Sequence, residues 1–176
     1  MKKLLVLPFL MSSFVLASSL NLEVTDSTLA VNAELSVPEN ENFALRATYL
    51  YNDNSGKDNY YSIGLQAEGQ NALDSYNTKL KIFVDFDHTK DNSAIPIGVG
   101  IVNNNFGNTD YPLFGSVEVA FAPKILSFDN AERLFKFKAE VGVQPIENAK
   151  AFIGYKKISF NSSYLSVGYV GIGFVF

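Results

Sequence analysis

The single histidine of the chain, His88, follows closely on the carboxylates Asp85 and Asp87. A histidine beside a carboxylate can act as a general base and activate a water molecule or a serine hydroxyl. One hypothesis is therefore a hydrolase site at the rim of the molecule. The alternative is a loop histidine that follows a strand of alternating acids. We favour this alternative and expect no enzymatic activity and no catalytic residues.

Metal and phosphate chemistry find little support in the sequence. Asp85, Asp87 and Asp91 carry the oxygen ligands that calcium prefers, but their spacing matches no known calcium loop. One histidine and no cysteine exclude a zinc site. Two Gly-x-Gly pairs, at 98–100 and 171–173, lie in strand-like segments and do not open a helix, so they are not phosphate loops. We expect no metal and no cofactor.

The first 17 residues are typical of a secretory signal peptide. Two lysines open the chain, and residues 4–16 are mostly apolar. Ala17 then precedes Ser18, which predicts cleavage between these two residues, and a cut after Ser19 is also acceptable. A membrane-anchoring helix is the alternative, but this stretch is shorter than the roughly 20 residues that a spanning helix needs. We therefore expect one folded domain over residues 18–176.

Apolar residues alternate with other residues through most of the mature sequence. Such a period of two predicts β-strands with two different faces. The predicted strands cover 29–35, 43–51, 61–67, 80–86, 95–101, 113–121, 135–143, 149–160 and 164–176. The segment 149–160 alternates less cleanly and has a lysine on each face, Lys156 and Lys157, so the sequence does not orient it.

The two faces of these strands differ sharply in charge. In the eight clearest segments, the apolar face carries no Asp, Glu, Lys or Arg. A Lys or Arg facing the middle of a bilayer costs roughly 2–4 kcal/mol, so the pattern fits a lipid-facing surface. A closed barrel is the β-structure that satisfies every backbone group in lipid. The alternative is a soluble sandwich or lipocalin-like barrel with its apolar face inward.

Aromatic residues favour the membrane alternative. They gather near the predicted strand ends, as in the girdles that mark the two membrane interfaces of outer-membrane barrels. The residues concerned are Tyr49, Tyr51, Tyr60, Tyr61, Phe86, Phe121, Tyr164 and Phe174. We therefore expect an all-β fold, a small antiparallel up-and-down transmembrane β-barrel, in the bacterial outer membrane after export through the periplasm.

The number of strands follows from the rule that single-chain bacterial barrels have an even number. Residues 20–24 supply a tenth strand if the chain turns at Asp26 and Ser27. Ten is the expected count. Eight remains the alternative if a weak segment, 20–24 or 149–160, is not an independent strand.

The opposite faces of the strands carry a nearly balanced set of charges that would point into the barrel. Six are acids and five are bases: Glu34, Arg46, Glu68, Lys79, Lys81, Asp85, Asp87, Glu118, Lys136, Lys138 and Glu140. Side chains mostly fill a lumen of eight to ten strands, so a general diffusion pore is not expected. Without its two signal-peptide lysines the chain has 12 basic and 18 acidic residues, which argues against nucleic acid as a partner.

Three stretches of the C-terminal third resemble the YfaZ family of outer-membrane proteins. They are Ala-Pro-Lys-Ile-Leu-Ser-Phe at 122–128 with Asp-Asn-Ala-Glu at 129–132, Gly-Val-Gln-Pro at 142–145 leading to Ala-Phe-Ile-Gly-Tyr at 151–155, and the closing residues 168–176. The N-terminal half matches only in its general barrel character. The resemblance implies a small outer-membrane barrel of poorly defined activity and brings no catalytic residues.

The last strand has a second interpretation. The apolar residues Val170, Ile172 and Phe174 alternate up to the terminal Phe176, a pattern that indicates a signal for the outer-membrane assembly machinery. Such a strand can add to an exposed sheet edge of an assembly protein. The other expected partner is outer-membrane lipid, and we expect a monomer. The favoured function is a structural or interaction role, followed by a narrow channel or small-ligand transporter and then by the rim hydrolase.

Overall fold

The computed structural model describes residues 18–37, 40–53, 57–73, 78–104 and 112–176. Within this part of the chain, ten antiparallel strands form a closed ring in which each strand pairs with its neighbours in sequence. They are β1 (Ser19–Val24), β2 (Thr28–Val37), β3 (Asn40–Asn52), β4 (Tyr60–Leu73), β5 (Thr78–His88), β7 (Ile97–Asn103), β8 (Leu113–Ala122), β10 (Leu134–Ile146), β11 (Ala149–Phe160) and β12 (Ser162–Val175). The predicted ten-stranded up-and-down barrel is confirmed.

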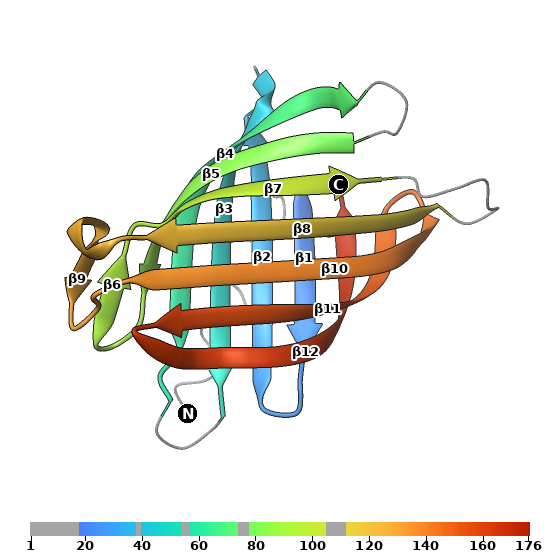
Figure 1. The fold of residues 1–176 in the computed structure, drawn as a ribbon. Coiled ribbons are helices and arrows are strands. Elements are labelled where there is room, and N and C mark those ends of the chain that lie inside the picture. The colour runs from blue at the N-terminus through green and yellow to red at the C-terminus, as the bar shows by residue number, and fades with distance from the viewer. Residues whose placement is uncertain (1–17, 38–39, 54–56, 74–77, 105–111) are drawn as a thin grey trace.

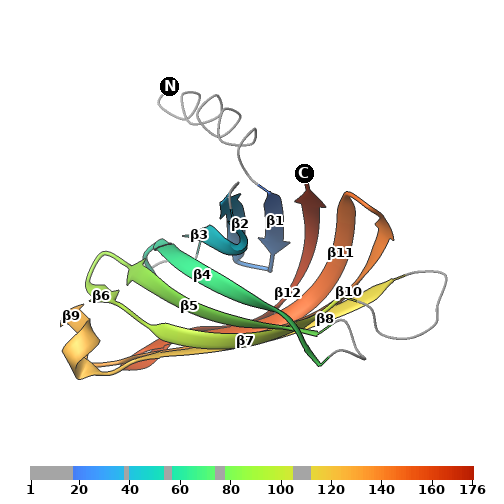
Figure 2. The ribbon, with the colours of Figure 1, turned by 90° about the horizontal axis from the view of Figure 1, so that it is seen from above.

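The ring closes between the first and last strands. β1 pairs with β12 in an unbroken register from Ser19 opposite Val175 to Val24 opposite Val170. The weak segment 20–24 is therefore a full member of the wall, and the eight-stranded alternative is wrong. In Figure 1 the strands of the near wall run across those of the far wall, as expected for tilted strands in a barrel. Figure 2 shows β1 lying between β2 and β12.

The two ends of the barrel differ. We call the end that holds Ser19 and Phe176 the terminus end and the opposite end the loop end. The short strands β6 (Asn92–Ala94) and β9 (Ser127–Asp129) extend the sheet at the loop end beside the 3-10 turn η1 (Lys124–Leu126). They lie beyond the wall in Figure 1.

Asn161 ties the loop end together. It forms the turn between β11 and β12 with a φ of 52°, a left-handed conformation that asparagine tolerates. Its side-chain oxygen accepts hydrogen bonds from the backbone N–H groups of Glu132 and Arg133, at 2.6 and 3.2 Å. Its side-chain nitrogen donates to the carbonyl of Asn130 at 2.8 Å. One side chain thereby fixes the connection between β8 and β10.

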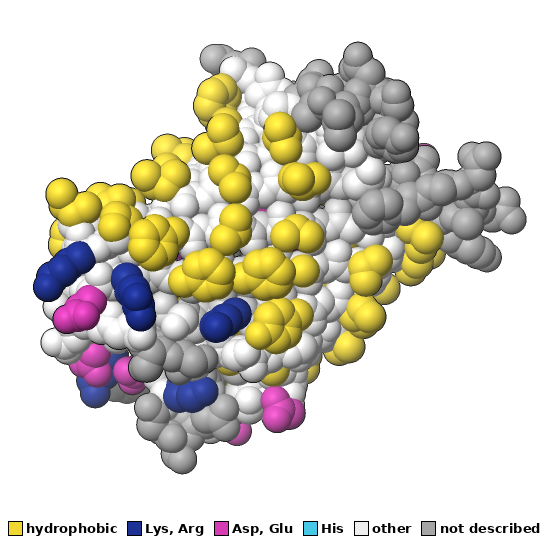
Figure 3. Space-filling model, viewed as in Figure 1, with side chains coloured by type: hydrophobic (Ala, Val, Ile, Leu, Met, Phe, Trp, Pro, Cys, Tyr) yellow, Lys and Arg dark blue, Asp and Glu magenta, His cyan; other side chains and the backbone are white. Residues whose placement is uncertain are grey.

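The outer wall is apolar. Side chains such as Ile63, Leu65, Ile82 and Val170 are 60% exposed, and their neighbours along each strand point inward. Figure 3 shows hydrophobic side chains spread over the wall and charged ones gathered towards one end. A soluble barrel would have the reverse arrangement, so the inward-apolar alternative is wrong.

The structure also orients β11. Lys156 is buried inside the barrel, and Lys157, next in the strand, points to the other face. Two residues assigned to the aromatic girdle are misplaced, however. Tyr60 is 2% exposed and packs inside the barrel, and Tyr164 stacks against it with ring centroids 6.4 Å apart.

The predicted signal peptide lies outside the described residues, as does Ala17 on one side of the predicted cleavage site. Ser18, on the other side, is the first described residue, and its backbone N–H donates to the carbonyl of Glu34 at 2.8 Å. No helix in the described part of the chain is long and apolar enough to cross a membrane.

Candidate functional site: the barrel lumen

The proposed dyad of His88 with Asp85 or Asp87 is not formed. The two aspartates point into the barrel and are fully buried, whereas His88 occupies an exposed position on the opposite face of β5. The imidazole Nδ1 instead lies 2.9 Å from the Ser93 hydroxyl, which donates to Asp129 at 2.6 Å. The Ser93 hydroxyl thus lies between His88 and Asp129 and is itself buried, and it donates its proton to the carboxylate instead of the imidazole.

The calcium hypothesis fails for the same reason. Asp85 and Asp87 both bind the Lys136 ammonium inside the barrel, at 2.7 and 2.8 Å. Across the described residues, no group of three or more His, Cys, Asp and Glu side chains could hold a metal ion.

The charged residues of the strands instead converge in the lumen. Every acid and base predicted to point inward takes part in an ion pair there. The structure adds Glu23, Lys150 and Lys156, which gives seven acids and seven bases. Sequence reasoning missed Lys150 and Lys156 because it did not orient the segment 149–160, and it missed Glu23 because it inferred the strand at 20–24 only from the even strand number.

The loop end of the lumen is closed by an apolar cluster, which we call the plug. The plug fills the space between strands on all sides of the barrel and excludes water from the polar side chains next to it. Its members are Ala30, Leu50, Tyr60, Ala94, Ala122, Ala131, Leu134, Ile158, Phe160 and Leu165, all at most 7% exposed. Tyr164 packs against the plug and donates a hydrogen bond to the Asp58 carbonyl.

A layer of buried charge lies beneath the plug. Lys136 on β10 reaches across to Asp85 and Asp87 on β5, and its ammonium also donates to the Tyr60 hydroxyl at 3.3 Å. Ser62 donates to Asp87 at 2.5 Å. Because both aspartate side chains are 0% exposed, they depend on Lys136 and their other protein partners instead of water.

Arg46 forms the layer of side chains at the middle of the lumen, which we call the waist. Its guanidinium bridges from β3 to Glu118 on β8, at 3.0 Å, and approaches Asp85 at 3.4 Å. The guanidinium carbon also lies 4.2 Å from the centre of the Phe83 ring. Phe83 in turn lies over Gly98, its partner on β7, where a Cβ atom would come within 2.2 Å of the ring. Gly98 therefore sets the position of the ring that supports Arg46.

The same pairing of an inward aromatic ring with a facing glycine recurs on other strands. Phe152 lies over Gly171, and Tyr169 lies over Gly154. These glycines make room for rings inside a narrow barrel.

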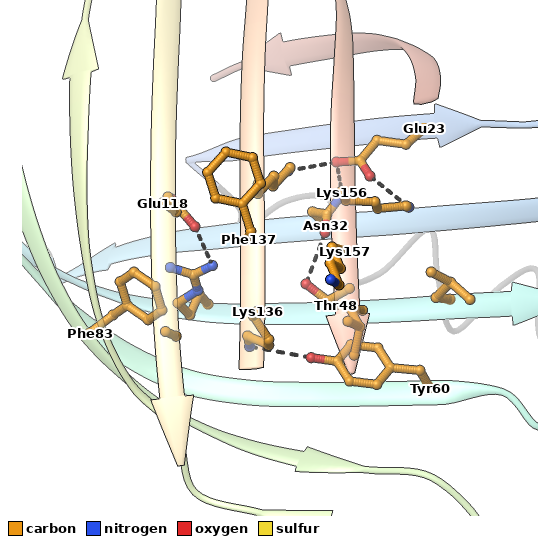
Figure 4. A pocket seen from close by; sticks show the side chains of 15 residues that line it. Glu23, Asn32, Thr48, Tyr60, Phe83, Glu118, Lys136, Phe137, Lys156 and Lys157 are labelled. Carbon is orange, nitrogen blue, oxygen red and sulfur yellow. Dashed lines mark hydrogen bonds and ion pairs between the residues drawn. The ribbon is translucent and has the colours of Figure 1, made fainter. Parts of the chain in front are cut away.

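Glu23 joins β1 to the far wall. We call the pairing of β1 with β12, where the ring closes, the seam. The Glu23 carboxylate accepts from Lys138 at 2.7 Å, from Lys156 at 3.0 Å and from the Asn32 amide at 2.7 Å. The Asn32 side-chain oxygen accepts in turn from the Thr48 hydroxyl at 2.8 Å. Figure 4 shows this chain of contacts beside the Glu118 and Lys136 groups.

Two cavities lie in the part of the lumen that the structure describes, one on each side of the waist. A small one of about 70 Å³ lies towards the plug and is lined by Leu50, Tyr60 and Lys136 among others. A larger polar one of about 350 Å³, which we call the chamber, lies towards the terminus end. Both are lined by the same central residues, namely Asn32, Arg46, Thr48, Glu118 and Lys138. One layer of side chains thus separates the two spaces.

Two solved structures match this arrangement of strands. One is a KdgM porin, which aligns with a TM-score of 0.50 and 10% sequence identity over 90% of this chain and 98% of that chain. The fold is shared with a porin. The other, a KdgM porin in complex with disordered oligogalacturonate, aligns with a TM-score of 0.49 and 8% identity over the same shares, which is too weak to support an argument.

At this identity the likeness to the KdgM porin shows the fold alone, since one fold can serve many functions. No protein-family model and no curated protein matches the chain. The specific resemblance to the YfaZ family is therefore not confirmed.

The predicted assembly-signal residues all lie on the outer wall. Val170, Ile172, Phe174 and Phe176 are between 40% and 66% exposed and form one face of the last strand segment. The Phe176 N–H donates to the carbonyl of Ser18 at 3.0 Å, across the seam.

Proposed function

We propose that the chain is an outer-membrane β-barrel that forms a narrow, gated passage for small polar solutes. The observation that carries the proposal is the pair of cavities separated by the single Arg46–Glu118 layer. A side-chain rearrangement at this layer would join the two spaces without any change in the wall. The porin fold of the structural neighbour supports a passage over a purely structural role.

The membrane location rests on the largely apolar outer wall, whose partner would be lipid. Heat-modifiable migration on SDS gels after outer-membrane extraction tests it, because a folded barrel runs differently from the boiled chain. Recovery of the protein in the soluble periplasmic fraction, with no shift on heating, would contradict the location.

Conduction is tested in planar bilayers. The double variant Arg46→Ser/Glu118→Ser removes both partners of the waist and leaves neither of them unpaired. We expect its single-channel conductance to exceed that of the wild type several-fold. The matched control is Lys79→Ser/Glu68→Ser, a pair nearer the terminus end, which should leave conductance unchanged. Silent bilayers for the wild type, the waist variant and a waist variant that also lacks plug side chains, with all proteins folded, would exclude a passage.

A structural or interaction role is the second candidate, and the plug favours it. Ten buried apolar residues close the loop end, so the passage also needs the plug to move. If the waist variant stays silent while a variant that also carries Leu50→Ala and Phe160→Ala conducts, the plug is a second barrier. If neither conducts, the barrel serves as a scaffold.

The role of the last strand in assembly is also a proposal. It is supported by the exposed row from Val170 to Phe176. Deleting Phe176 should lower the amount of protein in the outer-membrane fraction, and unchanged amounts would count against it. Membership of the YfaZ family is likewise a proposal, supported by the motifs at 122–132 and 142–155, and so is the monomeric state.

A further inference from the structure

Lys150 differs from every other charged residue of the lumen. It projects from the terminus end of β11 into the chamber and makes no ion pair with any residue that the structure describes. Its ammonium lies 5.3 Å from the centre of the Phe114 ring and 5.7 Å from that of Phe152. Ring faces attract a cation, but they supply no counter-charge for it.

The charge of the chamber follows from this residue. The lining contains three acids, Glu34, Glu118 and Glu140, and four bases, Arg46, Lys81, Lys138 and Lys150. The first three bases are paired with acids. Lys150 therefore brings into the chamber a positive charge that no ion pair of the described residues neutralises, and such a charge attracts anions.

A second unpartnered group lies beside the ammonium. Asn21 on β1 and Lys150 on β11 both face Gly173 of β12, so the three residues form one row across the seam. A Cβ atom on Gly173 would come within 2.2 Å of Asn21 Oδ1 and 2.5 Å of Lys150 Cε, so the two side chains meet over the glycine. Asn21 is 9% exposed, and its buried Oδ1 has no hydrogen-bond partner among the described residues.

A buried polar atom without a partner is costly, and so is an ammonium without a counter-ion. A ligand that offers a carboxylate to Lys150 and a hydroxyl to Asn21 Oδ1 would satisfy both. Phe114, which lines the same chamber, gives the carbon skeleton an apolar surface. At about 350 Å³ the chamber is at the small end of ligand pockets, which span roughly 300–1,000 Å³, so the ligand has a few carbons.

We propose that the chamber binds a small hydroxylated carboxylate, with Lys150 as the anion-binding residue and Asn21 as the residue that recognises the hydroxyl group. This inference goes beyond a passage for solutes, because binding needs only the chamber. Titration calorimetry on the full barrel refolded in detergent tests it independently of bilayer conductance. A silent bilayer would leave this binding result standing, and an absence of binding would leave a conducting bilayer standing.

Three probes of equal carbon number separate the two contacts. Glycerate carries the carboxylate and the hydroxyls, propionate only the carboxylate, and glycerol only hydroxyls. We expect glycerate to bind several-fold more tightly than propionate, and glycerol to give no measurable heat. Equal affinity for glycerate and propionate would overturn the role of Asn21.

Two variants then assign the residues. Lys150→Gln should weaken glycerate binding at least tenfold, whereas Lys79→Gln, a matched change at another terminus-end lysine, should change it less than twofold. Asn21→Ala should lower glycerate affinity to that of propionate. Unchanged glycerate affinity in Lys150→Gln, or no binding to a wild-type barrel that still shifts on heating, would overturn the proposal.

Discussion

The loop-end and terminus-end halves of the lumen are lined by the same ten strands but have opposite interiors. At the loop end, ten apolar side chains fill the space, and the carboxylates of Asp85 and Asp87 beneath them are wholly buried. At the terminus end, the lining is polar and leaves a chamber of about 350 Å³. The outer wall is apolar along both halves, so lipid does not distinguish them.

Because of this difference, an ion pair contributes a different amount to the unfolding free energy in each half. In the dry half, charges lack water, so removing one partner strands the other in a medium of low dielectric constant. In the open half, water can replace a missing partner, and exposed pairs contribute little. Matched substitutions can therefore measure how dry each half is.

The largest effect is expected for Lys136→Met. This change leaves Asp85 and Asp87 buried without their shared cation, and we expect a loss of roughly 3–5 kcal/mol in unfolding free energy. Urea unfolding in vesicles, followed by circular dichroism because the chain has no tryptophan, measures it. The triple variant Lys136→Met/Asp85→Asn/Asp87→Asn should recover much of the loss. A single variant as stable as the wild type would mean that water reaches this layer.

The next effect is expected for Phe160→Ala, which opens a cavity in the plug. Phe160 is 5% exposed, and truncating a buried phenylalanine costs about 3 kcal/mol. Phe121→Ala is the matched control, because that ring is 49% exposed on the outer wall. The control should lose clearly less stability in the same assay. Equal losses would contradict a tightly packed plug.

A smaller effect is expected for Gly98→Ala. The added methyl group would overlap the Phe83 ring and displace the support of Arg46, at a cost of about 2 kcal/mol. Gly69→Ala provides the control, since the nearest atom to its Cβ would be 3.9 Å away. Equal unfolding midpoints for the two variants would show that the ring moves freely and that the waist is not held by packing.

The smallest effect is expected for Lys79→Ala at the terminus end. The Lys79 side chain is 41% exposed, and its pair with Glu68 is long, at 3.4 Å. We expect a change in unfolding free energy of about 0.5 kcal/mol or less. A loss as large as that of Lys136→Met would remove the distinction between the halves.

Much of the wall was predictable from the sequence, because alternation reports directly on which face meets lipid. The strand at 20–24 was inferred only from the rule that such barrels have an even number of strands, since its five residues are too few for a clear period. The inward charges followed from the same alternation, but their partners did not. Lys136 and Asp85, for instance, are 51 residues apart and meet only when the ring closes.

The errors have a common cause. His88 was grouped with Asp85 and Asp87 by proximity in sequence, although adjacent strand residues point to opposite faces. Tyr60 and Tyr61 were both assigned to the girdle, and only Tyr61 faces outward. The plug was missed because its members are apolar residues on the otherwise polar faces, where they interrupt the pattern near strand ends. Packing inside the closed lumen determines which way these residues serve the fold, and the period of the sequence does not reveal that packing.

The seam between β1 and β12 has a consequence for the order of folding events. The other strand pairings of the ring join consecutive strands, whereas this one joins Ser19 to Val175. Such a distant contact bears a large loop-closure entropy and forms slowly. Glu23, on this late strand, then meets Lys138 and Lys156 on strands already in place. We expect closure to be the slow step in barrel formation, and Glu23 to act as the latch that slows reopening.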